Sequence, residues 1–410
     1  MSEENKNLNE QAPEQKPVEI KKPLDQKTLG IIIGAAVAVV AIIAIVLALV
    51  LGGGAPSETP NGDPAGDVVT DVDYKLGMGV VVSLDSSKTG TAQVDATVAT
   101  VVLDKDGKIV ACRIDAVQNK VTLNDDGTYV IPESFKTKME LGTAYGMGQS
   151  SITEANKWMD NNGDGKVLEW DVQTKAFEAF VVGKTVAEVE AMATKEAGGH
   201  IISADDALLN AGCTIQITDF KAAVVKACKD EQGVSFKVAS DKSFTLGVAA
   251  KSSNDSATKA ATAETEGVIA VYSDFAASAV VDGKIVASLN DAIQPKVGFT
   301  VAGEIASKSF SATKRELKGD YHMGQPEPLP ADKTWMDNNG DGKVKEWFEQ
   351  SAAFSAYVVG MTKAEVEGMA TQTLANGYVI SNDEALLGAC CTIQITGIKA
   401  VVAQSVAYAR

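Results

Sequence analysis

A long internal duplication constrains this sequence more than any other feature. The string "WMDNNGDGKV" occurs at 158–167 and again, letter for letter, at 335–344. Three more pairs keep a separation of 176 to 178 residues: "DGKIVACRIDAVQNKV" at 106 with "DGKIVASLNDAIQPKV" at 282, "AFVVGKTVAEVEAMAT" at 179 with "AYVVGMTKAEVEGMAT" at 356, and "CTIQIT" at 213 and 391. Because each copy must bury the same apolar pattern, the sequence predicts two domains of one fold. We place them at 73–230 and 243–410.

The sequence pattern of each copy predicts strands followed by helices. The Asp106–Gly107 pair stands between apolar runs, which predicts a hairpin with a tight primed turn. Apolar residues recur at helical spacing in the later half: Trp170, Phe177 and Val181 in the first copy, and Trp347, Phe354 and Val358 in the second. Two capping boxes predict the next helix: Thr185 with Glu188, and Thr362 with Glu365. A short strand "TIQIT" and a final helix complete each copy. The expected fold class is α+β, with an antiparallel β-sheet and helices in each repeat.

An apolar stretch precedes the repeats. Residues 29–51 carry no charge over 23 positions, which is enough for a helix to cross a bilayer. Lysines lie before this stretch, and no Lys or Arg follows it until Lys75, so the positive-inside rule puts 1–28 in the cytoplasm and the repeats outside. A cleaved signal peptide is the alternative, but the long polar leader and long apolar run favour an uncleaved anchor. A Gly/Pro/Asp-rich linker at 52–72 follows.

Charge and composition exclude some functions. The net charge of −17 argues against a nucleic-acid partner, which would need clustered Lys and Arg. The only two histidines, His200 and His322, fall at different places in the two repeats and lack zinc-like spacing. No Ser, Cys or Asp context around them suggests a hydrolase centre. An enzyme is therefore not the favoured interpretation, and no catalytic residue is assigned.

The duplicated string has the spacing of a calcium loop. Asp160, Asn162 and Asp164 occupy positions 1, 3 and 5 of a twelve-residue loop, Gly165 takes position 6, Lys166 offers its carbonyl at 7, and Asp171 takes position 12. A hard cation such as Ca²⁺ needs six to eight oxygen ligands, and this spacing supplies them from one turn. The loop resembles those of EF-hand and dockerin modules over about twelve residues. The alternative is an Asn/Gly turn that caps the following helix.

The second copy departs from this pattern at its end. Positions 1, 3, 5 and 7 are again filled, by Asp337, Asn339, Asp341 and the carbonyl of Lys343, but Phe348 stands at position 12. Glu346 or Glu349 would have to supply the missing oxygen ligand. If only one loop binds calcium, the first is therefore expected to bind it.

Strands, a helical second half and the run "AGCTIQITDFKAAVVKA" together resemble the FMN-binding domain family of extracytoplasmic electron-transfer proteins. In that family a "SGAT" stretch presents a Thr that takes FMN through a phosphoester bond. Here "AGCT" and "ACCT" put Thr214 and Thr392 at the acceptor position, while Ala211 and Ala389 replace the Ser. The resemblance thus implies FMN as a cofactor, and the altered motif favours a domain that keeps the fold without covalent flavin.

The five cysteines are an odd number for an exported chain, and two of them, Cys390 and Cys391, are adjacent. A disulfide between neighbours is strained and rare, so buried thiols are expected, with a redox role for the pair as the alternative. The sequence as a whole predicts a membrane-anchored extracytoplasmic binding or structural protein at the cell surface. Its expected partners are the membrane and other cell-envelope proteins. The alternative is an extracellular electron-transfer protein with FMN on one or both repeats.

Overall fold

A computed structural model describes residues 69–160, 163–324, 329, 331–337 and 342–410. The predicted tail at 1–28, the span at 29–51 and nearly all of the linker at 52–72 lie outside these residues. None of the helices in the described part is long and apolar enough to cross a bilayer.

The first repeat begins with long strands and continues with short helices. Its elements, in chain order, are β1 Asp71–Ser83, β2 Thr91–Leu103, β3 Ile109–Leu123, β4 Tyr129–Val130, α2 Lys138–Leu141, the 3₁₀ helices η1 Gly142–Tyr145, η2 Met147–Gln149 and η3 Lys157–Met159, α3 Trp170–Val181, α4 Val186–Glu190, β5 Thr194–Ala197, β6 His200–Ser203, α5 Asp206–Asn210 and α6 Thr218–Cys228. Strand β7, Val234–Ala239, follows between the predicted domains and pairs with β1.

The second repeat follows the same order. Its elements are β8 Thr245–Asn254, β9 Gly267–Val281, β10 Lys284–Ile293, β11 Lys296–Phe299, β12 Ile305–Ser309, α7 Lys314–Leu317, η4 Lys318–Tyr321, η5 Ala331–Met336, α8 Trp347–Tyr357, α9 Lys363–Glu367, β13 Thr371–Thr373, β14 Val379–Ser381, α10 Glu384–Gly388 and α11 Thr396–Ala407. The predicted α+β class with antiparallel sheets and helices is confirmed.

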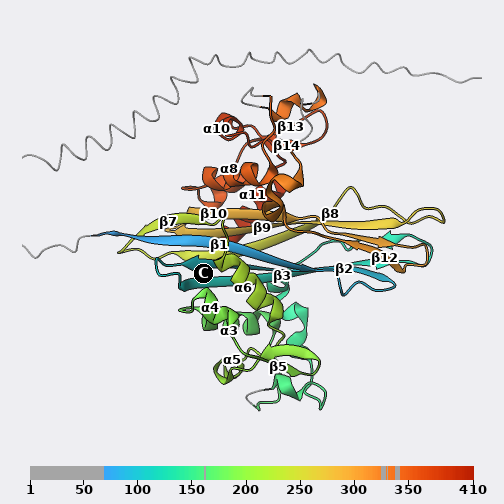
Figure 1. Cartoon of the computed structure of the whole chain (residues 1–410), viewed down its shortest axis with the longest axis vertical. Coiled ribbons are helices and arrows are strands. Elements are labelled where there is room, and N and C mark those ends of the chain that lie inside the picture. Colours follow the sequence, from blue (N-terminus) through green and yellow to red (C-terminus); the bar gives the residue numbers. More distant parts are fainter. Residues whose placement is uncertain (1–68, 161–162, 325–328, 330, 338–341) are drawn as a thin grey trace, which may run out of the picture. The chain divides into compact units, whose positions relative to one another are not determined.

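Two antiparallel sheets lie face to face, with helices on their outer sides. The first has strand order β4-β3-β2-β1-β7, and in the second β9 pairs with β8 on one edge and with β10 and β11 on the other. Figure 1 shows α3, α4 and α6 outside the first sheet and α8, α10 and α11 outside the second. One core cluster fills the space between the sheets and takes side chains from both repeats, including Val98, Val121, Val271 and Phe299. The repeats therefore share a hydrophobic core.

Each sheet also packs against its own helices through a separate core cluster. The central strands are consequently buried on both faces, and β2 is buried at nearly every position, with apolar residues on both faces. The close approach of helix and strand needs glycine: a Cβ on Gly77 would lie 2.1 Å from the Ala227 carbonyl oxygen, and one on Gly247 would lie 1.8 Å from that of Ser405. The same contact in both repeats makes β1 and β8, and α6 and α11, equivalent elements.

Several local predictions are confirmed. Both capping boxes form, at Thr185 with Glu188 and at Thr362 with Glu365. The predicted apolar faces are buried, with Trp170, Phe177 and Val181 in the first repeat and Trp347, Phe354 and Val358 in the second.

Two local predictions are wrong. The hairpin at Asp106–Gly107 forms, but only Gly107 has a positive φ, because the longer "DKDGK" connection uses the Asp104 carboxylate to accept the amides of Asp106 and Lys108. The tight primed turn occurs instead in the second copy, at Asp282 (φ 49°) and Gly283 (φ 78°). The segment "TIQIT" is not a strand in either copy, since a buried glutamine side chain binds its first amides.

Candidate functional site

Thr214, the expected flavin acceptor of the first repeat, is held by a buried glutamine of α3. Gln173 Oε1 accepts hydrogen bonds from the Thr214 amide (2.8 Å), the Ile215 amide (3.1 Å) and the Thr214 hydroxyl (3.1 Å). The Thr214 hydroxyl also contacts the Met159 carbonyl oxygen at 3.1 Å. Gln173 Nε2 donates to the Leu168 carbonyl at 2.8 Å, so one side chain joins α3 to two loops.

The second repeat reproduces this arrangement. Gln350 Oε1 accepts from the Thr392 amide (2.7 Å) and the Ile393 amide (3.0 Å), and Gln350 Nε2 donates to the Lys345 carbonyl (2.7 Å). Thr214 and Thr392 are both fully buried, at 2% and 0% exposure. A phosphoester on either hydroxyl would have to displace these contacts and open the local packing.

The cysteines beside these threonines lie in the same packed region. Burial raises the pKa of Cys213 and of Cys391 to about 12, so both thiols are protonated at neutral pH. Cys112, Cys213, Cys228 and Cys391 form no disulfide. Cys390 replaces Gly212 of the first repeat and keeps its left-handed backbone, with φ of 61° against 93°. A side chain in this region costs about 1–2 kcal/mol, so the second copy tolerates local strain.

The first calcium-type loop has part of the expected geometry. Asp160, at position 1, accepts the amides of Asp164 and Gly165 at 3.0 Å each, and Gly165, at position 6, has the positive φ of 75° that a sharp bend requires. Asp164 accepts the Lys166 amide at 3.0 Å. Asp171, at position 12, lies in the first turn of α3 and pairs with Lys175 at 2.6 Å. Asn162 lies outside the described residues.

The second loop shows the same start. Asp337 accepts the Gly342 amide at 2.9 Å, and Gly342 has φ of 78°. Asn339 and Asp341 lie outside the described residues, while Lys343 lies within them. Among the residues that the structure describes, no three His, Cys, Asp or Glu side chains converge as a metal-binding group.

The two glutamates that could replace Phe348 have other contacts. Glu346 accepts the amides of Met323 and Gly324 at 3.0 Å each, and Glu349 accepts the Glu346 amide at 2.9 Å. In the first repeat Glu169 accepts the Met147 amide at 3.1 Å in the same way. Glu346 and Glu169 therefore fix the loop that precedes each calcium-type segment.

Buried charges that the sequence analysis missed anchor one helical turn in each repeat. Asp115 accepts the amides of Ala116 (2.7 Å) and Met139 (3.2 Å), and its counterpart Asp291 accepts those of Ala292 (2.7 Å) and Arg315 (3.1 Å). Burial raises the pKa of Asp115 to about 7 and that of Asp291 to about 6. Their positions in the duplicated strings "CRIDA" and "SLNDA" could have identified them.

Lys314 of the second repeat is buried, whereas its counterpart Lys138 in the first repeat is half-buried. Lys314 Nζ lies 3.2 Å from the Tyr272 hydroxyl and over the rings of Tyr272 and Tyr321, 4.6 Å from each centroid. Burial lowers the pKa of Lys314 to about 8, and burial raises that of the neighbouring Asp274 to about 7. This charged cluster packs between the second sheet and its helices.

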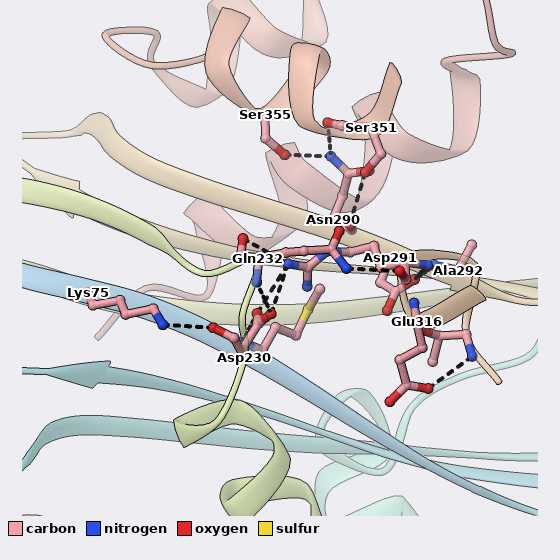
Figure 2. Close-up of polar contacts among 12 residues, drawn as sticks. Lys75, Asp230, Gln232, Asn290, Asp291, Ala292, Glu316, Ser351 and Ser355 are labelled. Atoms are coloured by element: carbon pink, nitrogen blue, oxygen red, sulfur yellow. Dashed lines mark hydrogen bonds and ion pairs between the residues drawn. The ribbon is translucent and has the colours of Figure 1, made fainter. Parts of the chain in front are cut away.

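A buried ion pair joins the two repeats. Arg315 Nη2, on α7, lies 3.2 and 3.1 Å from the two carboxylate oxygens of Asp230, and both side chains are less than a tenth exposed. Figure 2 shows Lys75 and Gln232 beside Asp230, and Lys75 donates to the Asp230 carbonyl at 2.7 Å. Asp230 also accepts the amides of Met78 (3.1 Å) and Gln232 (2.9 Å), so its carboxylate is held by donors from both repeats.

The contacts between repeats are reciprocal. Glu316 on α7 pairs with Lys226 on α6 at 2.6 Å, and the counterpart Glu140 on α2 accepts from Gln404 on α11. A further contact crosses between repeats where Arg410 Nη2 meets the buried Glu178 carboxylate at 2.7 Å. Each repeat therefore receives the end of the other's last helix at the same place, as in a twofold dimer.

Comparison with protein-family models, with curated proteins and with solved structures found no match. The FMN-binding-domain resemblance and the calcium-loop resemblance therefore stay predictions.

Proposed function

We propose that this chain is a membrane-anchored extracytoplasmic protein with a structural or binding role, in which the two FMN-binding-like repeats work as one paired unit. The supporting observation is the contact between repeats: a shared apolar core, a buried Arg315–Asp230 pair and reciprocal helix-end contacts. Such an arrangement fixes the two outer helical layers with respect to each other. It suits a rigid spacer or scaffold at the envelope better than two independent carriers.

The burial of Thr214 and Thr392 supports this role over flavin-dependent electron transfer. Each hydroxyl is already bound to a glutamine and lies in a packed core. A purified chain without the blue absorbance band of an oxidised flavin is the expected result. A flavin band that survives denaturation and is lost in Thr214→Val would overturn the proposal in favour of a covalent flavoprotein.

Residues 29–51 act in this proposal as an uncleaved anchor with the repeats outside the cell. The chain should remain with membranes after alkaline extraction, and protease added to intact cells should shorten it to the cytoplasmic tail and span. Recovery of the full chain in the soluble fraction would contradict the anchor.

Calcium binding at the first loop is a second part of the proposal, supported by the Asp160 contacts and the Gly165 bend. Because Lys175 occupies the Asp171 carboxylate, Lys175→Met should strengthen binding, whereas Asp160→Asn should abolish it. Asp337→Asn is the matched control in the second loop. Unfolding temperature measured with calcium and with chelator tests this, and equal temperatures for the parent chain would show that the loops are turns only.

A further inference from the structure

Strand β8 leaves one edge of the second sheet open along a cleft. Its only strand partner in the described part of the chain is β9, and the pairing runs without interruption from Thr245 to Asn254. On the other edge, Leu246 exchanges two backbone hydrogen bonds with Arg410, at 3.4 and 3.2 Å. In a strand, every second residue directs its backbone N–H and C=O groups to the same edge. The backbone groups of Ala250, Ser252 and Asn254 therefore point away from β9, as those of Leu246 do.

The equivalent edge of β1 is capped by side chains. There Leu76 pairs with Val234 of β7, the Met78 amide donates to Asp230 at 3.1 Å, and Lys226 Nζ donates to the Val80 carbonyl at 2.9 Å. Charged groups on an edge strand are a common protection against further strand pairing.

The second repeat lacks this cap. Gln404 and Tyr408 take the places of Lys226 and Asp230, and Gln404 donates to Glu140 and to the Tyr408 hydroxyl rather than to β8. None of the hydrogen bonds of the described residues reaches the outer backbone groups of Ala250 or Ser252. The two repeats therefore differ at this edge, where the second repeat leaves backbone groups to which a strand could be added.

The open edge forms a wall of a cleft of about 650 Å³. Residues 250–254 line it together with Glu140, Gln404 and the segment 131–136, which we call the far wall. Ile131 and Phe135 on the far wall pack against the core between the sheets. A walled cleft has room for a single extended chain, whereas the far wall obstructs the flat edge of a second folded copy.

We propose that the β8 edge at residues 250–254 is a binding site for an extended peptide, which adds to the second sheet as a strand. The peptide's backbone pairs with the outer groups of Ala250 and Ser252. The peptide residue opposite Ala250 directs its side chain to the same face of the sheet as Ala250, toward Ile131 and Phe135. This position of the peptide therefore takes an apolar residue. The next side chain points to the opposite face and takes a polar residue. The proposal does not depend on the membrane anchor or on calcium.

The test uses the full chain and a fluorescein-labelled heptapeptide in which valine and threonine alternate, measured by fluorescence polarisation. A peptide with proline at its centre, which cannot donate to the ladder, is the control ligand. The parent chain should bind the alternating peptide saturably and the proline peptide at least tenfold more weakly. Absence of saturable binding, or equal binding of both peptides, would overturn the proposal.

Two variants locate the site. Gln404→Lys transfers the cap of the first repeat, because a lysine there can pair with Glu140 and reach the Ala250 carbonyl as Lys226 reaches Val80. Ser134→Trp fills the cleft from its exposed far wall. Each should weaken binding at least tenfold, while Lys226→Gln in the first repeat, the matched control, should not weaken it. Unchanged binding in both cleft variants would place the peptide elsewhere and refute the assignment.

Amide hydrogen exchange and sedimentation separate peptide binding from other outcomes. Bound peptide should slow exchange of the outward Ser252 amide and leave Lys251, which pairs with β9, unchanged. If the parent chain self-associates in sedimentation and Gln404→Lys does not, a second copy occupies the edge and the peptide proposal fails.

Discussion

Replacing Gln173 with methionine tests whether the Thr214 segment is structural. Methionine keeps the length of the side chain but cannot accept from the Thr214 and Ile215 amides or donate to the Leu168 carbonyl. Gln173 is fully buried, so water does not replace the lost partners. Each buried group left without a partner costs about 1–3 kcal/mol, and three such groups give a loss of about 3–9 kcal/mol. That is a large fraction of the stability of a typical domain, about 5–15 kcal/mol.

Urea unfolding followed by tryptophan fluorescence measures this loss, because Trp170 begins the same helix and is buried. Gln350→Met, the counterpart in the second repeat, should give a similar loss, since its contacts are the same. Gln216→Met changes an exposed glutamine of the same segment and should stay within about 0.5 kcal/mol of the parent. A loss below about 1 kcal/mol for Gln173→Met would refute the structural role of this contact.

Two further predictions concern buried charges. Arg315→Met, which installs the residue of the first repeat (Met139), leaves the buried Asp230 carboxylate without its cation and should lower the free energy of unfolding by about 3 kcal/mol. The double variant Arg315→Met/Asp230→Asn should regain part of this free energy of unfolding in urea titrations. If the losses of the two single variants simply add in the double variant, the pair is not coupled. Asp115→Asn tests pH dependence: burial raises the folded-state pKa to about 7, above about 3.9 in the unfolded chain, so the stability that this carboxyl contributes is complete below about pH 4 and is lost as pH rises through about 7. The variant should therefore show a flatter fall in unfolding free energy between about pH 4 and 7, and identical slopes would contradict the raised pKa.

The local elements could be predicted from the sequence because their signals are local. A capping box is set by two residues three apart, and Thr185 with Glu188 forms one regardless of tertiary context. The buried face of α3 follows from the spacing of Trp170 and Phe177 in the same way. "TIQIT" was predicted as a strand because alternation of apolar and polar residues is typical of a strand. In the structure the amide of the buried Thr214 donates instead to the side chain of Gln173, 41 residues earlier.

Such local patterns could not predict how one repeat packs on the other. A strand that is apolar on both faces, as β2 is, shows that both faces are covered but not by what. Strand β7 falls at the predicted boundary between the repeats, and the Asp71–Leu76 part of β1 supplies the edge with which it pairs. Arg315 and Asp230 stand 85 residues apart, and Met139 and Tyr408 take their places in the other copy, so no duplicated motif marks the ion pair.

One set of differences between the repeats lies where the repeats meet each other. Within each repeat the Thr–Gln contact, the capping boxes and the helix-packing glycine are the same in both copies. Between repeats, Lys226 and Gln404 occupy equivalent positions and both reach a glutamate on the partner repeat, but only Lys226 also caps a strand edge. A twofold pair of identical units must place the same residue at both reciprocal contacts. Joining the two units in one chain removes that requirement, so one β-edge could be closed by Lys226 while the other, at β8, stayed open for a ligand.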